Sequence, residues 1–194
     1  DGVNINSGCG STHLERLKGM VTAGGYDLGI AFDGDADRCL MVDENGEEID
    51  GDQVIAACGL ALKERGELPG DTLVATVMSN LGFHIFCREH GIRLVCTDVG
   101  DRNVLENMDQ CGYVLGGEQS GHIIFSKHAR TGDGVLTSLM IMEVIMEKKQ
   151  SLAKMCEEVK IYPQLLKNGR VTDKKTAREN PAVQKAVEEV SAAL

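Results

Sequence analysis

The chain has 194 residues, of which 42% are apolar, and its formal net charge is −10. That length and apolar content suffice for one large domain or two small domains with a packed core. The negative charge argues against nucleic acid and against an anionic membrane surface as partners, because both would be repelled. A phosphorylated small molecule stays compatible, since one local cation can outweigh the global field.

No apolar stretch approaches the roughly 18 residues that a membrane span requires, and the first residues lack a signal-peptide pattern. The seven cysteines include no CxxC pair, and several lie in apolar runs such as "RLVCTDV". An odd number of such cysteines favours buried free thiols over disulfides or zinc ligands. We therefore expect a protein of the reducing cytoplasm.

Strands and helices alternate along the chain. Helical spacing over 12–23 ends at two glycines, and the apolar run 27–32 predicts a strand of the kind buried on both faces in a parallel sheet. A strand over 39–43 leads into Asn45-Gly46, a dipeptide typical of tight hairpins. Further on we expect helices over 52–66, 81–91, 100–112, 134–150 and 180–194, and strands over 72–78, 92–99, 113–118 and 120–125.

This alternation predicts an α/β fold: a three-layer αβα domain with a mixed, mostly parallel sheet, flanked by partial domains. One helix precedes the first strand and the last helix has no sheet left to cover, so both ends look cut. We expect one complete unit from about residue 51 to about residue 160. Met140, Met142 and Met146 of the long helix are expected to fill the core.

The segment "DGDADR" (33–38) places three aspartates two residues apart between two apolar runs. At the end of a strand, Asp33, Asp35 and Asp37 would lie at the mouth of a sheet, where open α/β folds bind ligands. Their repulsion is relieved if their oxygens share a hard divalent cation, and magnesium is the natural candidate. Arg38 would neutralise remaining charge or face an anionic group of a ligand.

Three other interpretations of this loop need weighing. A calcium EF-hand requires glycine where Arg38 stands, and helices rather than strands on both sides. A phosphatase with Asp33 as its nucleophile would also begin Asp-x-Asp, although such loops usually carry threonine or valine at the position of Asp37. A solvated turn whose charges serve only solubility is the structural alternative.

A second segment, "YVLGGEQSGH" (113–122), runs from an apolar strand into a turn that exposes a carboxylate, a hydroxyl and an imidazole. Its glycines let the backbone bend closely around a ligand. Glu118 and Ser120 suit adjacent ring hydroxyls of a hexose. His122 could instead be a histidine that is satisfied at the start of the next strand.

Two further loops precede predicted helices. In "TDVGDRN" (97–103), Arg102 could add positive charge toward a substrate phosphate. The alternative is a surface arginine beside an N-cap at Asp101. In "TGDGV" (131–135), Asp133 is expected to cap the long helix.

Together these segments resemble the phosphohexomutase superfamily. "DGDADR" is similar to its metal-binding loop, Asp-Gly-Asp-x-Asp-Arg, and "GGEQSGH" (116–122) to its sugar-binding loop, Gly-Glu-x-Ser-Gly-His. "NSGCGSTH", "MSNLG" and "TDVGDR" resemble the bacterial phosphoglucosamine mutase branch in particular. The similarity covers nearly the whole chain.

The resemblance implies a magnesium-dependent transfer of phosphoryl groups between a phosphoserine and a phosphorylated hexosamine. It assigns magnesium binding to Asp33, Asp35 and Asp37, substrate binding to Glu118, Ser120 and Arg102, and catalysis to Arg38 and His122. The glutamate and serine would hold the 3- and 4-hydroxyls of the sugar, and the histidine would lie near the reacting end.

The same resemblance divides the chain into the end of a second domain (1–50), a third domain (51–160) and the start of a fourth (161–194). Serine loops of Ser-His-Asn-Pro type and phosphate loops of Ser-Gly-Thr-Glu-Pro type are absent from the sequence. We therefore expect no turnover from this chain alone and weak metal binding at best. An unpaired edge strand in the shortened second domain could produce a homo-oligomer or a domain swap.

Other functions stay open from the sequence. A sister mutase that acts on mannose or glucose phosphates would carry the same two loops. The aspartate-nucleophile phosphatase and a non-enzymatic interaction module are the alternatives from other classes.

Overall fold

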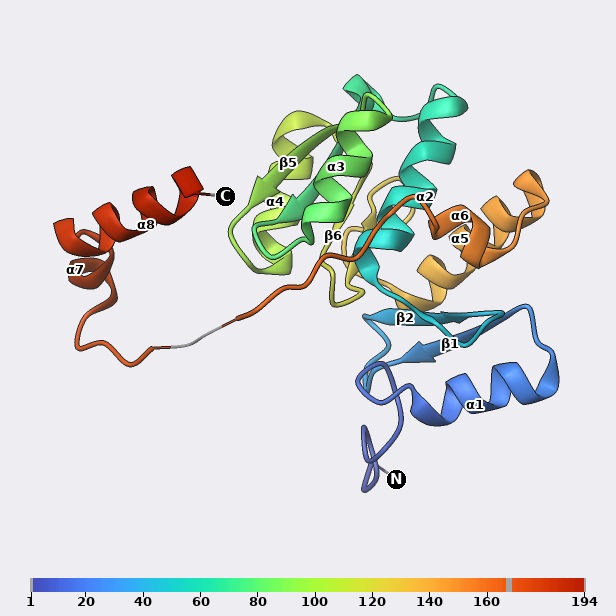
Figure 1. Ribbon diagram of the computed structural model, residues 1–194. Helices are drawn as coiled ribbons and strands as arrows, with labels where there is room; N and C mark the ends of the chain where they lie inside the picture. Colours follow the sequence, from blue (N-terminus) through green and yellow to red (C-terminus); the bar gives the residue numbers. More distant parts are fainter. Residues whose placement is uncertain (1, 167–168, 194) are drawn as a thin grey trace. The chain divides into compact units, whose positions relative to one another are not determined.

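This computed structural model describes residues 2–166 and 169–193. The chain divides into two units. The units are Asp1–Tyr162 and Pro163–Leu194. Every strand of the described residues belongs to the larger unit, and the smaller unit is helical (Figure 1).

A three-stranded antiparallel sheet with one covering helix lies in the first part of the larger unit (Figure 1). Its elements are α1 (Glu15–Gly24), β1 (Leu28–Phe32), β2 (Cys39–Asp43) and β3 (Glu48–Ile49). Val21 of α1 packs with Leu40 and Val42 of β2, the central strand. The predicted hairpin at Asn45-Gly46 is confirmed, since β2 and β3 pair antiparallel across it and Gly46 has φ = 87°.

The prediction that 27–32 forms a parallel strand buried on both faces is wrong. β1 pairs antiparallel with β2 along its whole length, and Gly29 is the one buried residue of the strand. The physical reason is the short connection through residues 33–38. A parallel pair would need a crossover of about a dozen residues or more.

A four-stranded sheet forms the centre of the larger unit. Its strands lie in the order β5-β4-β6-β7, with β4 parallel to β5 and β6, and β7 antiparallel to β6. Their bounds are β4 (Thr72–Thr76), β5 (Arg93–Thr97), β6 (Leu115–Gly117) and β7 (Ile123–Phe125). This is the mixed, mostly parallel sheet that the sequence predicts.

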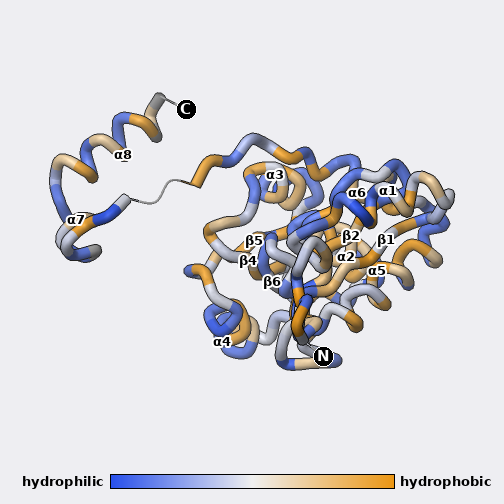
Figure 2. The backbone as a smooth tube through the Cα atoms, turned by 90° about the horizontal axis from the view of Figure 1, so that it is seen from below, coloured by the Kyte–Doolittle hydropathy of each residue, from blue (hydrophilic) through white to orange (hydrophobic). Residues whose placement is uncertain are grey.

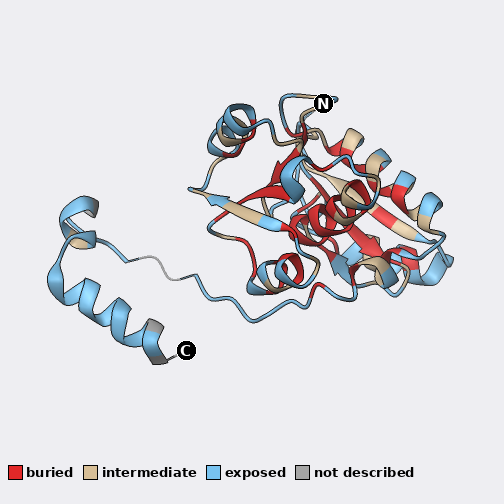
Figure 3. Cartoon of the chain, turned by 90° about the horizontal axis from the view of Figure 1, so that it is seen from above, coloured by how far each residue is buried: buried red, intermediate tan, exposed pale blue. Residues whose placement is uncertain are grey.

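Helices cover both faces of this sheet, which confirms the three-layer arrangement. They are α2 (Gly51–Glu64), α3 (Leu81–Glu89), α4 (Asp101–Cys111), α5 (Gly134–Lys148) and α6 (Leu152–Cys156), with a 3₁₀ turn, η1, at Pro69–Asp71. Leu73 and Ala75 of β4 belong to the core shared with α2 and α3, whereas Val74 packs against Val104 and Met108 of α4. Strands β4, β6 and β7 are accordingly buried, whereas the edge strand β5 is not (Figure 3).

The smaller unit consists, in its described part, of α7 (Lys174–Arg178) and α8 (Pro181–Ala193). α8 confirms the helix predicted over 180–194, whose last residue lies outside the described residues. Hydrophilic and hydrophobic residues alternate along it (Figure 2), and Val183, Val187 and Val190 are exposed. Neither α8 nor any other described helix combines the length and apolarity that a bilayer span requires.

The cysteines are free, as predicted, but their burial is not uniform. Cys9, Cys96 and Cys111 are exposed. Cys96 lies on β5, an edge strand of the central sheet, and is therefore exposed although it follows apolar residues in the sequence. Met146 likewise departs from the predicted core role, because it is 76% exposed near the end of α5.

A buried carboxylate ties the start of α2 to the loop after β4. Asp52 is fully buried, and its oxygens accept hydrogen bonds from Ser79 Oγ (2.9 Å) and Asn80 N (2.6 Å). Burial raises the pKa of Asp52 to about 6, although these two donors oppose the rise. Asn80 also exchanges hydrogen bonds with the main chain of Tyr162, at 2.8 and 2.9 Å. The network therefore holds the last residue of the larger unit.

Replacing Asp52 by asparagine is expected to change how stability depends on pH. A carboxyl whose pKa is higher in the folded chain than in the unfolded chain keeps its proton longer when folded. Its contribution is therefore present at low pH and is lost as the pH rises from 3.8 to about 6. Relative to Asp52→Asn, the wild-type free energy of unfolding should fall by about 1–3 kcal/mol over that range and then stay level, as measured by urea unfolding.

Asp27→Asn controls for the loss of one negative charge, because Asp27 is exposed. If the wild-type and Asp52→Asn stabilities ran parallel across this pH range, the account of the buried carboxyl would be wrong.

Candidate functional site

The acidic loop after β1 folds so that its three carboxylates face a common point. One oxygen from each of Asp33, Asp35 and Asp37 lies within 4.8 Å of the other two. Asp35 is exposed and the other two are half-buried. Ala36 takes a left-handed backbone conformation, φ = 59°, which turns the chain between the second and third aspartates. The convergence expected from the sequence is thus present.

Burial and crowding both act on the Asp37 carboxyl. Its pKa is raised, first by partial burial and next by the Asp33 carboxyl, with which it can share a proton, while His122 opposes the rise. Carboxyls this close offer a divalent ion a set of oxygen ligands. The three residues therefore fit a hard cation such as Mg²⁺, and they leave about half of its octahedral positions to water or to a ligand.

Arg38 balances part of this negative charge. Its main-chain N–H donates to Asp33 Oδ1 at 3.1 Å, and its Nε lies 3.9 Å from Asp33 Oδ2. The arginine side chain is 46% exposed, so its remaining N–H groups are open to an anionic ligand. Both oxygens of Asp33 are thereby engaged by the same residue.

His122 connects the acidic loop to two other loops. Its side chain is 5% exposed, and its Nδ1 lies 2.9 Å from Asp37 Oδ2. Its Nε2 accepts a hydrogen bond from the main-chain N–H of Gly132 at 3.0 Å. The sequence left open whether this histidine is a buried, satisfied residue or a group near the ligand. The structure gives both ring nitrogens protein partners.

The backbone joins the same loops. Arg38 and His122 form an antiparallel bridge, and Cys39 N donates to Gly121 O at 3.1 Å. Asp133 lies in the loop 131–134, next to Gly132, and caps α5 as predicted, accepting a hydrogen bond from Leu136 N at 2.9 Å. The antiparallel sheet and the central sheet therefore meet at the candidate site.

Glu118 lies at the carboxyl end of β6, in the predicted sugar-binding turn. Its Oε1 accepts a hydrogen bond from the main-chain N–H of Gly100 at 3.1 Å. The turn is closed by hydrogen bonds from Glu118 N to His122 O (2.9 Å) and from Gly121 N to Glu118 O (3.0 Å). Ser120, at its tip, is exposed. One carboxylate oxygen and one hydroxyl thus remain for a ligand.

Gln119 anchors this turn to the start of α2, a contact that sequence reasoning missed. Its Nε2 donates to Asp50 Oδ2 at 3.0 Å, and its carbonyl accepts from Gly51 N at 2.9 Å. Asp50 also forms a reciprocal capping box with Gln53. Burial raises the pKa of Asp50, against the opposing effect of these donors. The capping box is readable from the spacing of 50 and 53, but the partner at 119 is not.

A cleft of about 520 Å³ lies where these loops meet. The sequence predicted three of its lining residues, Arg38, Glu118 and Ser120. The others are Leu40, Glu48, Asp50, Thr76, Met78, Val99 and Gln119. Among the described residues that line the cleft, Arg38 is the one cation.

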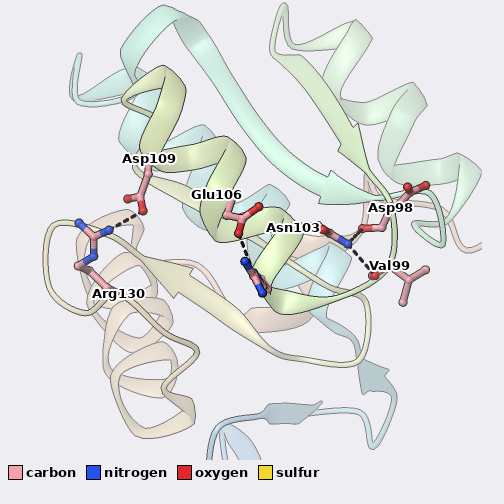
Figure 4. A network of polar contacts seen from close by, with 7 residues as sticks. Asp98, Val99, Asn103, Glu106, Asp109 and Arg130 are labelled. Atoms are coloured by element: carbon pink, nitrogen blue, oxygen red, sulfur yellow. Dashed lines mark hydrogen bonds and ion pairs between the residues drawn. The ribbon is translucent and has the colours of Figure 1, made fainter.

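Arg102 lies apart from this cleft. It is on α4, its side chain is 85% exposed, and its Nε donates to Glu106 Oε1 at 2.7 Å. Asp101 does not cap the helix, because Gly100 occupies the N-cap position without a side-chain bond. Asn103 instead binds the carbonyls of the preceding loop (Figure 4). The surface interpretation of Arg102 thus matches its position in the structure.

Comparisons with known proteins agree on one family. A family model described as "Phosphoglucomutase/phosphomannomutase, alpha/beta/alpha domain III" matches residues 50–162. Over its full length, the chain is 56% identical to a phosphoglucosamine mutase of Lachnoclostridium phytofermentans and 53% identical to one of Symbiobacterium thermophilum. The chain spans 43% of the length of each relative.

A solved structure shares the fold. It is that of Aspergillus fumigatus N-acetylphosphoglucosamine mutase in complex with GlcNAc-6P and magnesium, with a TM-score of 0.71 over 95% of this chain and 45% of that chain. Sequence identity is 17%, so the likeness bears on the fold alone.

Titration of the chain with Mg²⁺ in a calorimeter is expected to show binding weaker than micromolar, because three carboxylates supply about half of the ligands that the ion prefers. Asp35→Asn should weaken that binding by at least about tenfold without a loss of stability, since Asp35 is exposed. Asp27→Asn is the matched control. Micromolar or tighter binding, or an Asp35→Asn variant that binds like the wild type, would contradict this description.

Proposed function

This chain belongs to the phosphoglucomutase/phosphomannomutase family, and we propose that it works as part of a phosphoglucosamine mutase, which interconverts glucosamine 6-phosphate and glucosamine 1-phosphate. The observation that carries the proposal is the cleft, which Arg38, Glu118 and Ser120 line next to three convergent carboxylates. A cation site, a guanidinium and a pair of hydroxyl-binding groups together suit a phosphorylated sugar. The names of the relatives support an amino sugar.

In this proposal Asp33, Asp35 and Asp37 hold a magnesium ion. Such an ion, when bound, draws charge from a transferring phosphoryl group. Arg38 contacts phosphoryl oxygens through the N–H groups that Asp33 does not engage. The choice of metal rests on the three carboxylate ligands, and the A. fumigatus enzyme, which shares the fold, was also solved with magnesium.

Glu118 and Ser120 bind the sugar ring in the same proposal. Gly100 fixes one oxygen of Glu118, so the other oxygen accepts from a ring hydroxyl. The hydroxyl of Ser120 can donate to or accept from the neighbouring ring hydroxyl. A contact of Arg102 with the substrate phosphate would require its side chain to leave Glu106.

We further propose that residues 1–50 are the end of a second domain, 51–160 a third domain and 161–194 the start of a fourth. The match of a domain III model to residues 50–162 supports the middle assignment. The phosphoserine that such a mutase uses would come from a part of the protein outside this chain, because the sequence carries no Ser-His-Asn-Pro motif. Free thiols support a reducing compartment such as the cytoplasm.

A chimera tests the proposal: this chain replaces the matching 43% of the L. phytofermentans enzyme. We expect the chimera to convert glucosamine 6-phosphate in a coupled assay with a higher kcat/KM than glucose 6-phosphate or mannose 6-phosphate. Glu118→Gln should lower kcat/KM by about 10–100-fold, because a hydrogen bond to a charged group contributes about 1.5–3 kcal/mol.

Arg130→Ala is the control for this chimera, because Arg130 pairs with Asp109 and does not line the cleft. Equal rates with glucose and glucosamine phosphates would contradict the amino-sugar assignment. Covalent trapping of Asp33 by beryllium fluoride would favour the phosphatase instead.

A further inference from the structure

Three loops meet behind the acidic trio, and one buried ring touches each of them. The loops are 33–38, 118–122 and 131–134. His122 belongs to the second loop, binds Asp37 of the first through Nδ1 and accepts from Gly132 of the third at Nε2. The sequence motifs did not predict that the third loop, 131–134, lies at the candidate site.

The hydrogen bonds of His122 assign its tautomer. A main-chain N–H can only donate, so the Nε2 that faces Gly132 is an acceptor and carries no proton. The proton of the neutral ring is therefore on Nδ1, where it is donated to Asp37 Oδ2 at 2.9 Å. Because both nitrogens have protein partners and the side chain is 5% exposed, the ring offers no free nitrogen to a substrate.

The third loop is built to hold this arrangement. A Cβ added at Gly132 would lie 2.5 Å from Cε1 and Nε2 of the His122 ring, so the glycine lets the backbone reach the imidazole. Gly134 N donates to Ala36 O at 2.8 Å, and a Cβ there would lie 2.6 Å from Arg38 O. The same loop therefore supports both the ring and the strained turn at Ala36, where φ is 59°.

We infer that His122 is a positioning residue for the divalent cation: it orients the Asp37 carboxylate from behind, and Gly132 fixes the tautomer with which it does so. The inference deepens the proposed function, because it takes Asp33, Asp35 and Asp37 as the ligands. Asp37 follows a left-handed residue and is 32% exposed, so its carboxylate needs an outside group to set its rotation. A bond from Nδ1–H to Oδ2 leaves Oδ1 for the ion, and carboxylates that bind metals in proteins are commonly held by such outer hydrogen bonds.

This role differs from the catalytic role that the resemblance implies for His122. A general acid or base must present a nitrogen to the reacting oxygen. The geometry instead directs one nitrogen to a metal-ligand carboxylate and the other to a main-chain N–H.

The test measures the metal site rather than turnover. Mn²⁺ serves as the probe, because its binding to the 194-residue chain can be followed by electron paramagnetic resonance at sub-millimolar affinity. We expect His122→Ala to weaken Mn²⁺ binding by about 10–100-fold, the usual cost of losing a group that orients a metal ligand. His122→Asn should restore most of the affinity, since its amide N–H lies where Nδ1–H was, and His122→Gln should restore less.

His128→Ala is the matched control, because His128 is exposed. Thermal melting of each variant separates a folding defect from a local one. If the alanine variant does not fold, the glutamine variant carries the test, because it is also expected to bind Mn²⁺ more weakly than the wild type. In the wild-type chain without metal, long-range ¹⁵N–¹H spectra should show the Nδ1–H tautomer of His122.

The outcomes are distinct. If wild-type chain bound no Mn²⁺, the proposed metal centre itself would fail, and this inference with it. If the wild type bound Mn²⁺ and the folded His122→Ala variant bound it equally well, the positioning role would be overturned while the proposed function stood. The same holds for equal binding by the folded His122→Gln variant if the alanine variant does not fold. An Nε2–H tautomer in the spectra would also overturn it.

Discussion

The candidate site depends on one short contact between two sheets. Arg38 and His122 pair as an antiparallel bridge, and Cys39 donates to the carbonyl of Gly121 at 3.1 Å. Gly121 has φ = 93°, and a Cβ there would lie 2.5 Å from Cys39 O, so this approach of the two backbones requires glycine. Because the contact fixes the acidic loop against the turn at 118–122, the distance between the proposed cation site and the proposed sugar site is set by backbone geometry.

Charge balance gives the site its second constraint. The chain carries a net charge of −10. Among the described residues that line the cleft, Arg38 is the one cation and Glu48, Asp50 and Glu118 are acidic. A phosphate group that entered the cleft would be repelled by the excess of carboxylates. In the proposed function, a divalent ion on the neighbouring trio would invert that local field, so the cation and the phosphorylated ligand would each favour the binding of the other. An acidic protein can in this way bind an anionic substrate.

Local features of this fold and site could be predicted from the sequence, and contacts between distant segments could not. The spacing of Asp33, Asp35 and Asp37 after an apolar run was enough to predict their convergence, but not the contacts of His122 and Gly134 that support the loop. The bond between Gln119 and Asp50 joins residues 69 positions apart and leaves no periodic signal. The partner of Arg102 could have been predicted locally, because Glu106 lies four residues later on the same helix, at the spacing that allows an ion pair.

The most direct test of the central claim is anomalous diffraction from crystals of this chain soaked in Mn²⁺. The account predicts one anomalous peak bonded to oxygens of Asp33, Asp35 and Asp37 together, at the roughly 2.0–2.2 Å typical of small divalent cations, with His122 Nδ1 still bound to Asp37. A peak elsewhere, or three carboxylates that turn apart with no shared ion, would contradict it.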